Sequence, residues 1–283
     1  MTDFSEMSSS PGGRPNLVAL VADDFAATRA NLVSAIQTFD PSSKIIEATD
    51  GNQAVAAIGE HVPDIAFVNV QLPQLSGAEA LAFCRAQGIK AFTVLLSNIV
   101  VPEWVEVSLR LGAYEFLKKP FDPDHVTHLL RAFDRTRTPI KLLLVDASHA
   151  SREMVRRILL SSGFSFEIDE TDTGQHAVKV LRTTHYDVAM IERNLPVGID
   201  GLETACQANQ IAPETKLILM SSSDLGPLEQ VARHFGVVAL LKKPFFPRDI
   251  DFAIHQALGL RRPYLLNALV PLAVPLIRKA VGL

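Results

Sequence analysis

The sequence predicts an α/β protein of two tandem domains, each a doubly wound parallel sheet of five strands with helices on both faces. Short apolar runs alternate with segments of helical length from residue 16 to residue 260, as in chains built from βαβ units. The same series occurs twice along the chain. A length of 283 residues also suits two domains of common size.

The first domain is expected to span residues 16–137. Strands are predicted where short runs of apolar and β-branched residues stand between polar segments, and helices are predicted in the intervals. The last of these helices ends near residue 137. The predicted strands are 17–21, 45–48, 64–70, 92–96 and 114–117.

The second domain is expected to span residues 140–260, because the series of apolar runs begins again at Lys141. Residues 135–139 interrupt the pattern and form the predicted junction, which is short and partly helical. The last helix is expected to end near Gly259.

Four polar positions of the first half recur in the second, which makes the internal repeat specific. The separation between partners grows by one residue after the third strand, because Pro196–Gly201 is one residue longer than Pro73–Gly77. A single loop insertion therefore explains the register. The recurring pairs are Asp23 and Asp146, Asn69 and Glu192, Ser97 and Ser221, and Lys119 and Lys243.

Composition limits the classes of partner and compartment. Residues 1–15 are rich in Ser, Pro and Gly without an apolar run, which predicts a disordered tail rather than a signal peptide. The net charge of -4 gives no reason to expect nucleic acid as a partner. Cys84 and Cys206 lack metal-type spacing, so they favour a reducing, cytoplasmic setting over a disulfide or zinc site.

The C-terminal segment, residues 261–283, is apolar and flanked by basic residues. Its apolar part, 264–277, is too short to span a bilayer, and Pro271 and Pro275 interrupt any helix there. Three interpretations stay open. The segment packs on its own domains or on a second copy, docks on a partner protein, or makes peripheral contact with a membrane surface.

The repeated unit resembles the receiver domain of two-component response regulators, a flavodoxin-like (βα)5 fold. The resemblance covers about residues 16–137 and 140–260. It rests on several motifs in the same order, found twice. In the first half these are the acidic pair Asp23-Asp24 with Arg29, the third strand through Asn69 to Pro73 and Gly77, the hydroxyl of Ser97, and Lys119-Pro120-Phe121. In the second half they are Asp146 with Arg152, the third strand through Glu192 to Pro196, Ser221, and Lys243-Pro244-Phe245.

The resemblance implies a role for each of these positions. A carboxylate on the third strand accepts a phosphoryl group, an acidic pair holds Mg²⁺, and a hydroxyl and a lysine hold the phosphoryl oxygens. The implied acidic pocket is Asp23, Asp24 and Asp146, and the implied hydroxyl and lysine positions are Ser97, Lys119, Ser221 and Lys243.

The sequence departs from the family at the acceptor positions. Asn69 is neutral and a poor nucleophile, and Glu192 places its carboxylate one methylene farther out than aspartate does. Ala147 also replaces the second acid of the pair in the second domain. We therefore expect no catalytic residue, no enzymatic activity and no resident cofactor or metal, apart from weak Mg²⁺ binding at Asp23 and Asp24.

Two positions have open interpretations. Glu192 either imitates a phosphorylated aspartate or simply neutralises Lys243, because a buried lysine needs a counter-charge in both cases. Asn69 is expected to be a hydrogen-bonded polar residue rather than a ligand. At the position three residues before the lysine, where the family has an aromatic switch, the chain has Phe116 and Leu240.

These observations favour a phosphorylation-independent adaptor or scaffold in a bacterial two-component or phosphorelay pathway. Its expected partners are other signalling proteins, such as a histidine kinase, a response regulator or a polar or cell-cycle factor. The sequence is also compatible with an oligomer of this chain. The alternatives are an atypical phosphoryl-accepting response regulator and a small-ligand sensor that uses the vestigial pocket.

Overall fold

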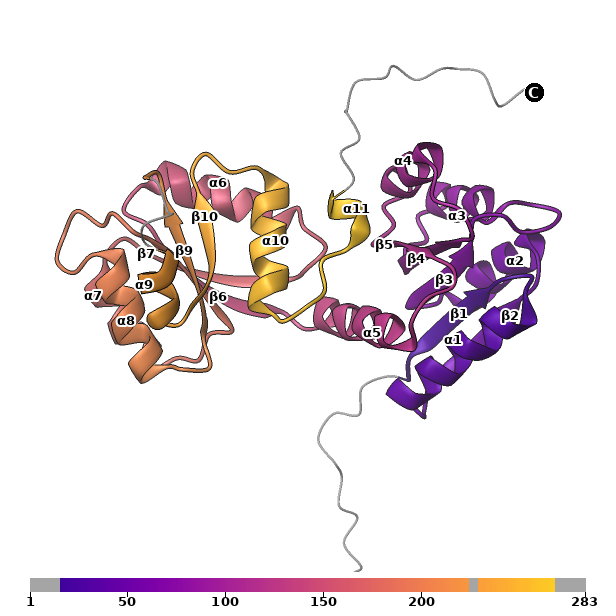
Figure 1. Ribbon diagram of the computed structural model, residues 1–283, viewed down its shortest axis with the longest axis horizontal. Coiled ribbons are helices and arrows are strands. Elements are labelled where there is room, and N and C mark those ends of the chain that lie inside the picture. The colour runs from indigo at the N-terminus through magenta and orange to yellow at the C-terminus, as the bar shows by residue number, and fades with distance from the viewer. Residues whose placement is uncertain (1–15, 224–228, 268–283) are drawn as a thin grey trace, which may run out of the picture. The chain divides into compact units, whose positions relative to one another are not determined.

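The computed structural model describes residues 16–223 and 229–267, which form two compact units. Each unit contains one five-stranded parallel sheet with helices around it (Figure 1). The fold class predicted from the sequence is confirmed.

The first sheet has the strand order β2-β1-β3-β4-β5. This order places β1 and β3 side by side, and β4 beside β3. The strands are β1 (Val18–Ala22), β2 (Lys44–Ala48), β3 (Ile65–Asn69), β4 (Phe92–Ser97) and β5 (Glu115–Lys118), and the helices are α1 (Ala26–Phe39), α2 (Gly51–His61), α3 (Gly77–Ala86), α4 (Pro102–Arg110) and α5 (Pro123–Arg137).

The second sheet repeats the topology, with the order β7-β6-β8-β9-β10. Its strands are β6 (Ile140–Val145), β7 (Phe166–Thr171), β8 (Val188–Glu192), β9 (Lys216–Ser221) and β10 (Val237–Lys242). Its helices are α6 (His149–Leu160), α7 (Gly174–Leu181), α8 (Gly201–Ile211), α9 (Glu229–His234), α10 (Pro247–Ala257) and the short α11 (Tyr264–Asn267).

The second sheet shows how alternation along a strand builds two cores. Leu142 and Leu144 of β6 face a cluster with α6 and α10, whereas Leu143 and Val145 face a cluster with α7, α8 and α9. Successive side chains of a strand point to opposite faces, so a wholly apolar strand is buried on both. This burial explains why the sequence shows continuous apolar runs rather than alternation.

Helix α5 completes the first βα series in the sequence. By its contacts, however, the chain from Asp124 onward groups with the second unit. One such contact is the ion pair between Arg135 of α5 and Asp187, with a nitrogen–oxygen distance of 3.2 Å. Only Thr138 and Pro139 separate α5 from β6, so the predicted junction is mostly helix.

The C-terminal segment begins by packing on its own unit. Helix α10 ends at Ala257, and Gly259 follows with a left-handed backbone (φ 65°). The Arg262 guanidinium then lies 4.3 Å from the centroid of the Phe252 ring, and Leu265 is buried. In the described residues no helix is long and apolar enough to cross a membrane. The rest of the segment lies outside the described residues, as does the tail predicted for residues 1–15.

Two glycines let a helix approach the end of the third strand closely. A Cβ atom on Gly77 would lie 2.0 Å from the Asn69 carbonyl oxygen, and one on Gly201 would lie 2.1 Å from that of Glu192. These contacts involve backbone atoms, which cannot move aside without shifting the strand. The N-terminus of α3 therefore packs directly against the backbone of Asn69, and the N-terminus of α8 packs against that of Glu192.

We predict that Gly77→Ala destabilises the first unit by about 1–3 kcal/mol through overpacking. Gly59→Ala is the matched control, because a Cβ there meets nothing within 4 Å and Gly59 lies on an exposed turn of α2. The control should raise stability by up to about 1 kcal/mol. Urea unfolding followed by fluorescence of Trp104, the chain's single tryptophan, reports on the first unit. Equal changes in the free energy of unfolding for Gly77→Ala and Gly59→Ala would contradict the close approach of α3 to the end of β3.

Candidate functional site

The site of the first domain lies at the carboxyl edge of its sheet, where β1, β3, β4 and β5 end. Asp23 follows β1, is fully buried, and forms an ion pair with Lys119, whose side chain is 9% exposed. The other Asp23 oxygen accepts a hydrogen bond from the Phe25 backbone N–H at 2.9 Å. Parallel strands bring groups that are distant in sequence together at this edge.

Asn69 ends β3 and is also buried. Its amide nitrogen donates to a carboxylate oxygen of Asp24 at 3.0 Å and to the Gln71 carbonyl oxygen at 2.9 Å. A carboxylate at this position would be repelled by the Asp24 carboxylate and the Gln71 carbonyl oxygen, whereas the amide N–H groups donate hydrogen bonds to both. The sequence-based expectation of a hydrogen-bonded polar residue agrees with this geometry.

Ser97 and Phe116 lie on the neighbouring strands. Ser97 is buried at the end of β4, and its hydroxyl oxygen accepts the Ile99 backbone N–H at 3.2 Å. Phe116 is buried in β5, where it pairs in register with Leu95. Its counterpart Leu240 is half-buried in β10 and pairs with Leu219.

In the second domain, Lys243 bridges two carboxylates. Its ammonium nitrogen lies 2.6 Å from an Asp146 oxygen and 2.5 Å from a Glu192 oxygen. Both acids are buried, and the lysine side chain is 20% exposed. The second Glu192 oxygen accepts the Asn194 backbone N–H at 3.1 Å. Ser221 occupies the place of Ser97, and its hydroxyl accepts the Ser223 backbone N–H at 3.0 Å.

Ser151 belongs to this network, although the sequence analysis did not single it out. Its hydroxyl donates to Asp146 at 2.7 Å and accepts from the Lys243 ammonium at 3.0 Å. The repeat contained a signal for it, since Thr28 holds the same position in the first domain. A hydroxyl on the first turn of the helix after β6 faces the carboxyl edge of the sheet.

The surroundings of Lys243 decide its charge. Burial by itself lowers the lysine pKa, but the hydrogen bonds and negative charges of Asp146 and Glu192 outweigh burial, so the pKa of Lys243 is raised above its usual value. The ammonium is therefore held as a cation between two acids.

An arginine fixes the first strand in each domain. Arg29 donates to the Asp23 carbonyl oxygen at 2.9 Å and pairs with Glu47 at 2.9 Å. Arg152 makes the equivalent bonds to the Asp146 carbonyl oxygen at 2.5 Å and to Glu170 at 2.9 Å. Each arginine thus connects the backbone of the acidic residue to the neighbouring strand, β2 in the first domain and β7 in the second.

The donor sets differ in how well they suit Mg²⁺, a cation that prefers oxygen ligands. The first domain offers carboxylate oxygens from Asp23 and Asp24 and the carbonyl oxygen of Gln71, although Lys119 and Asn69 already contact one oxygen of each acid. The second domain has Ala147 in place of an acid, and Lys243 occupies both remaining carboxylates. The residues present fit a hard cation in the first domain and do not fit one in the second.

A parallel sheet with an acid, an acceptor position, a hydroxyl and a lysine at its carboxyl edge defines the class of phosphoacceptor signalling domains. The family model for the response regulator receiver domain matches residues 19–131 and again residues 142–255. The chain therefore belongs to the response regulator receiver family and carries two receiver domains in tandem.

Two curated proteins match this chain over one domain, and a solved structure matches it over most of its length. The chain is 30% identical over 114 residues to the chemotaxis protein CheY of Listeria monocytogenes, which covers 40% of this chain and 95% of that protein. It is 30% identical over 117 residues to the response regulator UvrY of Escherichia coli, covering 41% of this chain and 53% of that protein. A crystal structure of a two-component system response regulator/GGDEF domain protein superposes with a TM-score of 0.61 at 20% identity, covering 86% of this chain and 98% of that one. This last likeness concerns the fold.

We predict that Glu192→Gln lowers the pKa of Lys243 and weakens the second unit. A lysine with a raised folded-state pKa contributes stability that is fully present below its unfolded pKa of about 10.5 and is lost as pH rises through the folded pKa. In the variant this loss begins at lower pH. Urea unfolding followed by circular dichroism between about pH 8 and 11.5 measures the shift, with Trp104 reporting the first unit separately.

The control for this substitution is Glu153→Gln. Glu153 pairs with Arg157 at 2.9 Å on the exposed face of α6, where the two side chains are 43% and 77% exposed. Exposed pairs contribute little to stability, so the pH dependence should not change. An unchanged profile for Glu192→Gln would show that the ion pair with Lys243 does not set the lysine pKa.

Proposed function

We propose that the chain is a phosphorylation-independent signalling adaptor, built from two degenerate receiver domains, that acts by protein–protein contact in a two-component pathway. The observation that supports this most strongly is the Lys243 bridge to Asp146 and Glu192. The lysine that would hold an incoming phosphoryl group is already neutralised by carboxylates of its own domain. Glu192 thereby gives the second domain a fixed negative charge at the acceptor position.

The first domain supports the proposal in a different way. Asn69 has no negative charge and no nucleophilic oxygen of carboxylate type, and its amide is committed to Asp24 and Gln71. Lys119 is paired with Asp23. In this proposal the first domain stays in an unphosphorylated-like state and binds Mg²⁺ weakly at Asp23 and Asp24, whereas Glu192 imitates a phosphorylated acceptor in the second.

The face formed by α9, β10 and α10 is the contact surface that we propose for the second domain. It contains a hollow of about 280 Å³ that runs along β10, an edge strand of the sheet. The Gln256 side chain donates to the Val238 carbonyl oxygen at 2.6 Å there and so covers part of the strand edge. The residues that line the hollow are Glu229, Arg233, Val237, Val238, Ala239, Leu240 and Gln256.

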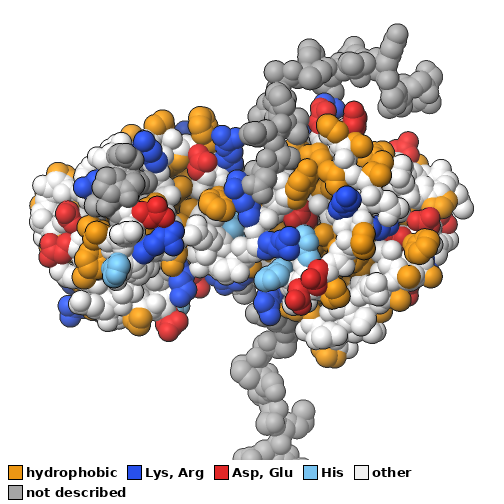
Figure 2. Space-filling view, viewed as in Figure 1, with side chains coloured by type: hydrophobic (Ala, Val, Ile, Leu, Met, Phe, Trp, Pro, Cys, Tyr) orange, Lys and Arg blue, Asp and Glu red, His pale blue; other side chains and the backbone are white. Residues whose placement is uncertain are grey.

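Surface charge favours a protein partner over nucleic acid. On the face that Figure 2 shows, each unit carries both basic and acidic side chains. Nucleic-acid-binding domains concentrate Lys and Arg on one face, and the net charge of the chain is -4. The proposed partners are therefore other signalling proteins of the pathway.

The direct experiment treats the intact chain with acetyl phosphate or phosphoramidate and Mg²⁺ and measures its mass. We predict no phosphoryl adduct on the wild-type chain, because Asn69 and Glu192, rather than aspartates, stand at the ends of β3 and β8. A receiver domain that accepts a phosphoryl group from the same donor serves as the positive control for the donor. A stoichiometric mass gain of one phosphoryl group would establish the alternative, an atypical phosphoryl-accepting regulator.

We also predict different outcomes for the two repairs of the acceptor position. Asn69→Asp should restore Mg²⁺ binding and phosphorylation in the first domain, because Asp23, Asp24, Ser97 and Lys119 remain in place. Glu192→Asp should not restore either in the second, because Ala147 still replaces a metal ligand. The intact mass of each variant measures its phosphorylation, and a Mg²⁺ titration measures its metal binding. Full phosphorylation of Glu192→Asp would overturn the role assigned to Ala147.

A further inference from the structure

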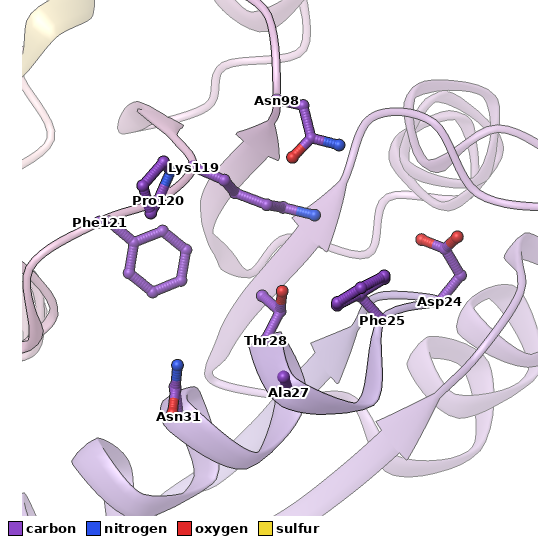
Figure 3. Close-up of a pocket in the computed structure, with 9 residues that line it drawn as sticks. All are labelled: Asp24, Phe25, Ala27, Thr28, Asn31, Asn98, Lys119, Pro120 and Phe121. Atoms are coloured by element: carbon purple, nitrogen blue, oxygen red, sulfur yellow. The ribbon is translucent and has the colours of Figure 1, made fainter.

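A pocket of about 460 Å³ opens beside the vestigial site of the first domain (Figure 3). It lies between the start of α1, the end of β4 and the loop after β5. Its size is within the range of small-molecule sites. The residues that line it are Asp24, Phe25, Ala27, Thr28, Asn31, Asn98, Lys119, Pro120 and Phe121.

Phe25 is not explained by the stability of its own helix. It is the N-cap residue of α1, forms no side-chain cap, and is 68% exposed. Its counterpart in the second domain is Ser148, whose side chain accepts the Ser151 backbone N–H at 3.3 Å and caps α6. Serine at an N-cap is worth about 1 kcal/mol over an apolar residue. The first domain has instead an exposed ring at the mouth of the pocket.

Phe121 provides a second ring. It is half-buried and lines the pocket, and Figure 3 shows it and Phe25 on opposite sides, with Thr28 between them. Its counterpart Phe245 is buried in the core of the second domain, 6% exposed. Figure 3 shows the Phe121 ring face-on and the Phe25 ring edge-on, so the two faces do not oppose each other. Each ring instead offers an apolar surface on which a flat group can stack.

Three polar side chains of the pocket have unused hydrogen-bonding capacity. In the described part of the chain, no hydrogen bond is formed by the side chains of Thr28, Asn31 and Asn98. The matching serine of the second domain, Ser151, is fully engaged by Asp146 and Lys243. The two free amides each offer a donor and an acceptor, which complements the edge of a heterocycle that carries both.

The charge of the pocket excludes an anion as the preferred ligand. Lys119 is paired with Asp23, so the two side chains together add no net positive charge to the pocket. Asp24 remains, with one oxygen bonded to Asn69 and an exposed side chain. The rim is therefore negative, and it favours a donor such as an amino or ring N–H group.

From these observations we propose that the first domain binds a planar nitrogen heterocycle of the nucleobase type, uncharged or singly cationic, stacked on the exposed ring of Phe25 in the pocket that Phe121 also lines. In this proposal Asp24 and the side-chain amides of Asn31 and Asn98 form hydrogen bonds with the polar edge of the heterocycle. The site is independent of the adaptor proposal, since a chain that binds no heterocycle still serves as an adaptor, and a phosphorylated chain still has this pocket.

Calorimetric titration of the full chain with adenosine, guanosine, cytidine and uridine tests the site. We expect at least one nucleoside to bind at one site per chain with a Kd below about 1 mM. Its 5′-monophosphate should bind more weakly, because the added charge meets the negative rim. Phe25→Ser, which introduces the residue of the second domain, should weaken binding about 10-fold through lost stacking without lowering the stability reported by Trp104.

Phe246→Ser is the matched control, because Phe246 is a 61% exposed N-cap phenylalanine of α10 in the other domain. It should leave nucleoside binding unchanged. No detectable binding of any of the four nucleosides would overturn the proposal. Binding that survives Phe25→Ser, that is lost equally in Phe246→Ser, or that is tighter for the monophosphate would overturn it as well.

Discussion

The ammonium group of a lysine just beyond the last strand of each sheet is the group around which both sites are organised. Lys119 is 9% exposed and Lys243 is 20% exposed, so each charge needs a counter-charge close by. The parallel topology determines where that charge comes from, because the first strand ends in Asp23 or Asp146 at the same edge. In the second domain the acceptor-position residue Glu192 is itself a partner of the lysine.

The two domains satisfy this constraint in different ways. In the first, one acid neutralises Lys119, and the neutral Asn69 is free to bond Asp24 and the backbone. In the second, Asp146 and Glu192 share Lys243, and the hydroxyl of Ser151 completes the network. The first site is left open enough to border a pocket of about 460 Å³. The proposed functions follow from this difference. The first domain has a pocket that can bind a ligand, whereas in the second domain the carboxylates of Asp146 and Glu192 hold Lys243 in place.

Much of this was predictable from the sequence, because repeats and apolar runs report topology. The strands, the single insertion between Pro196 and Gly201 and the residues that meet at the sheet edge all follow from them. The sequence places α5 in the first βα series, and the family match also runs to residue 131, whereas the contacts group the chain from Asp124 onward with the second unit. The orientation of the Asn69 amide and the bond of Ser151 to Lys243 were also beyond the sequence, because hydrogen-bond partners depend on positions finer than register. The pocket depends on the exposure of Phe25 and Phe121, which composition does not reveal.

The most direct test of the central claim is whether either lysine can release its carboxylate partner to a phosphoryl analogue. Beryllofluoride with Mg²⁺ supplies such an analogue, and ¹⁹F NMR detects the bound form separately from the free one. Because Asn69 has no carboxylate oxygen to hold the beryllium, and Glu192 is already bonded to Lys243, the account predicts no protein-bound fluorine signal from the wild-type chain. A bound, Mg²⁺-dependent signal that disappears in Lys119→Met or Lys243→Met would contradict it.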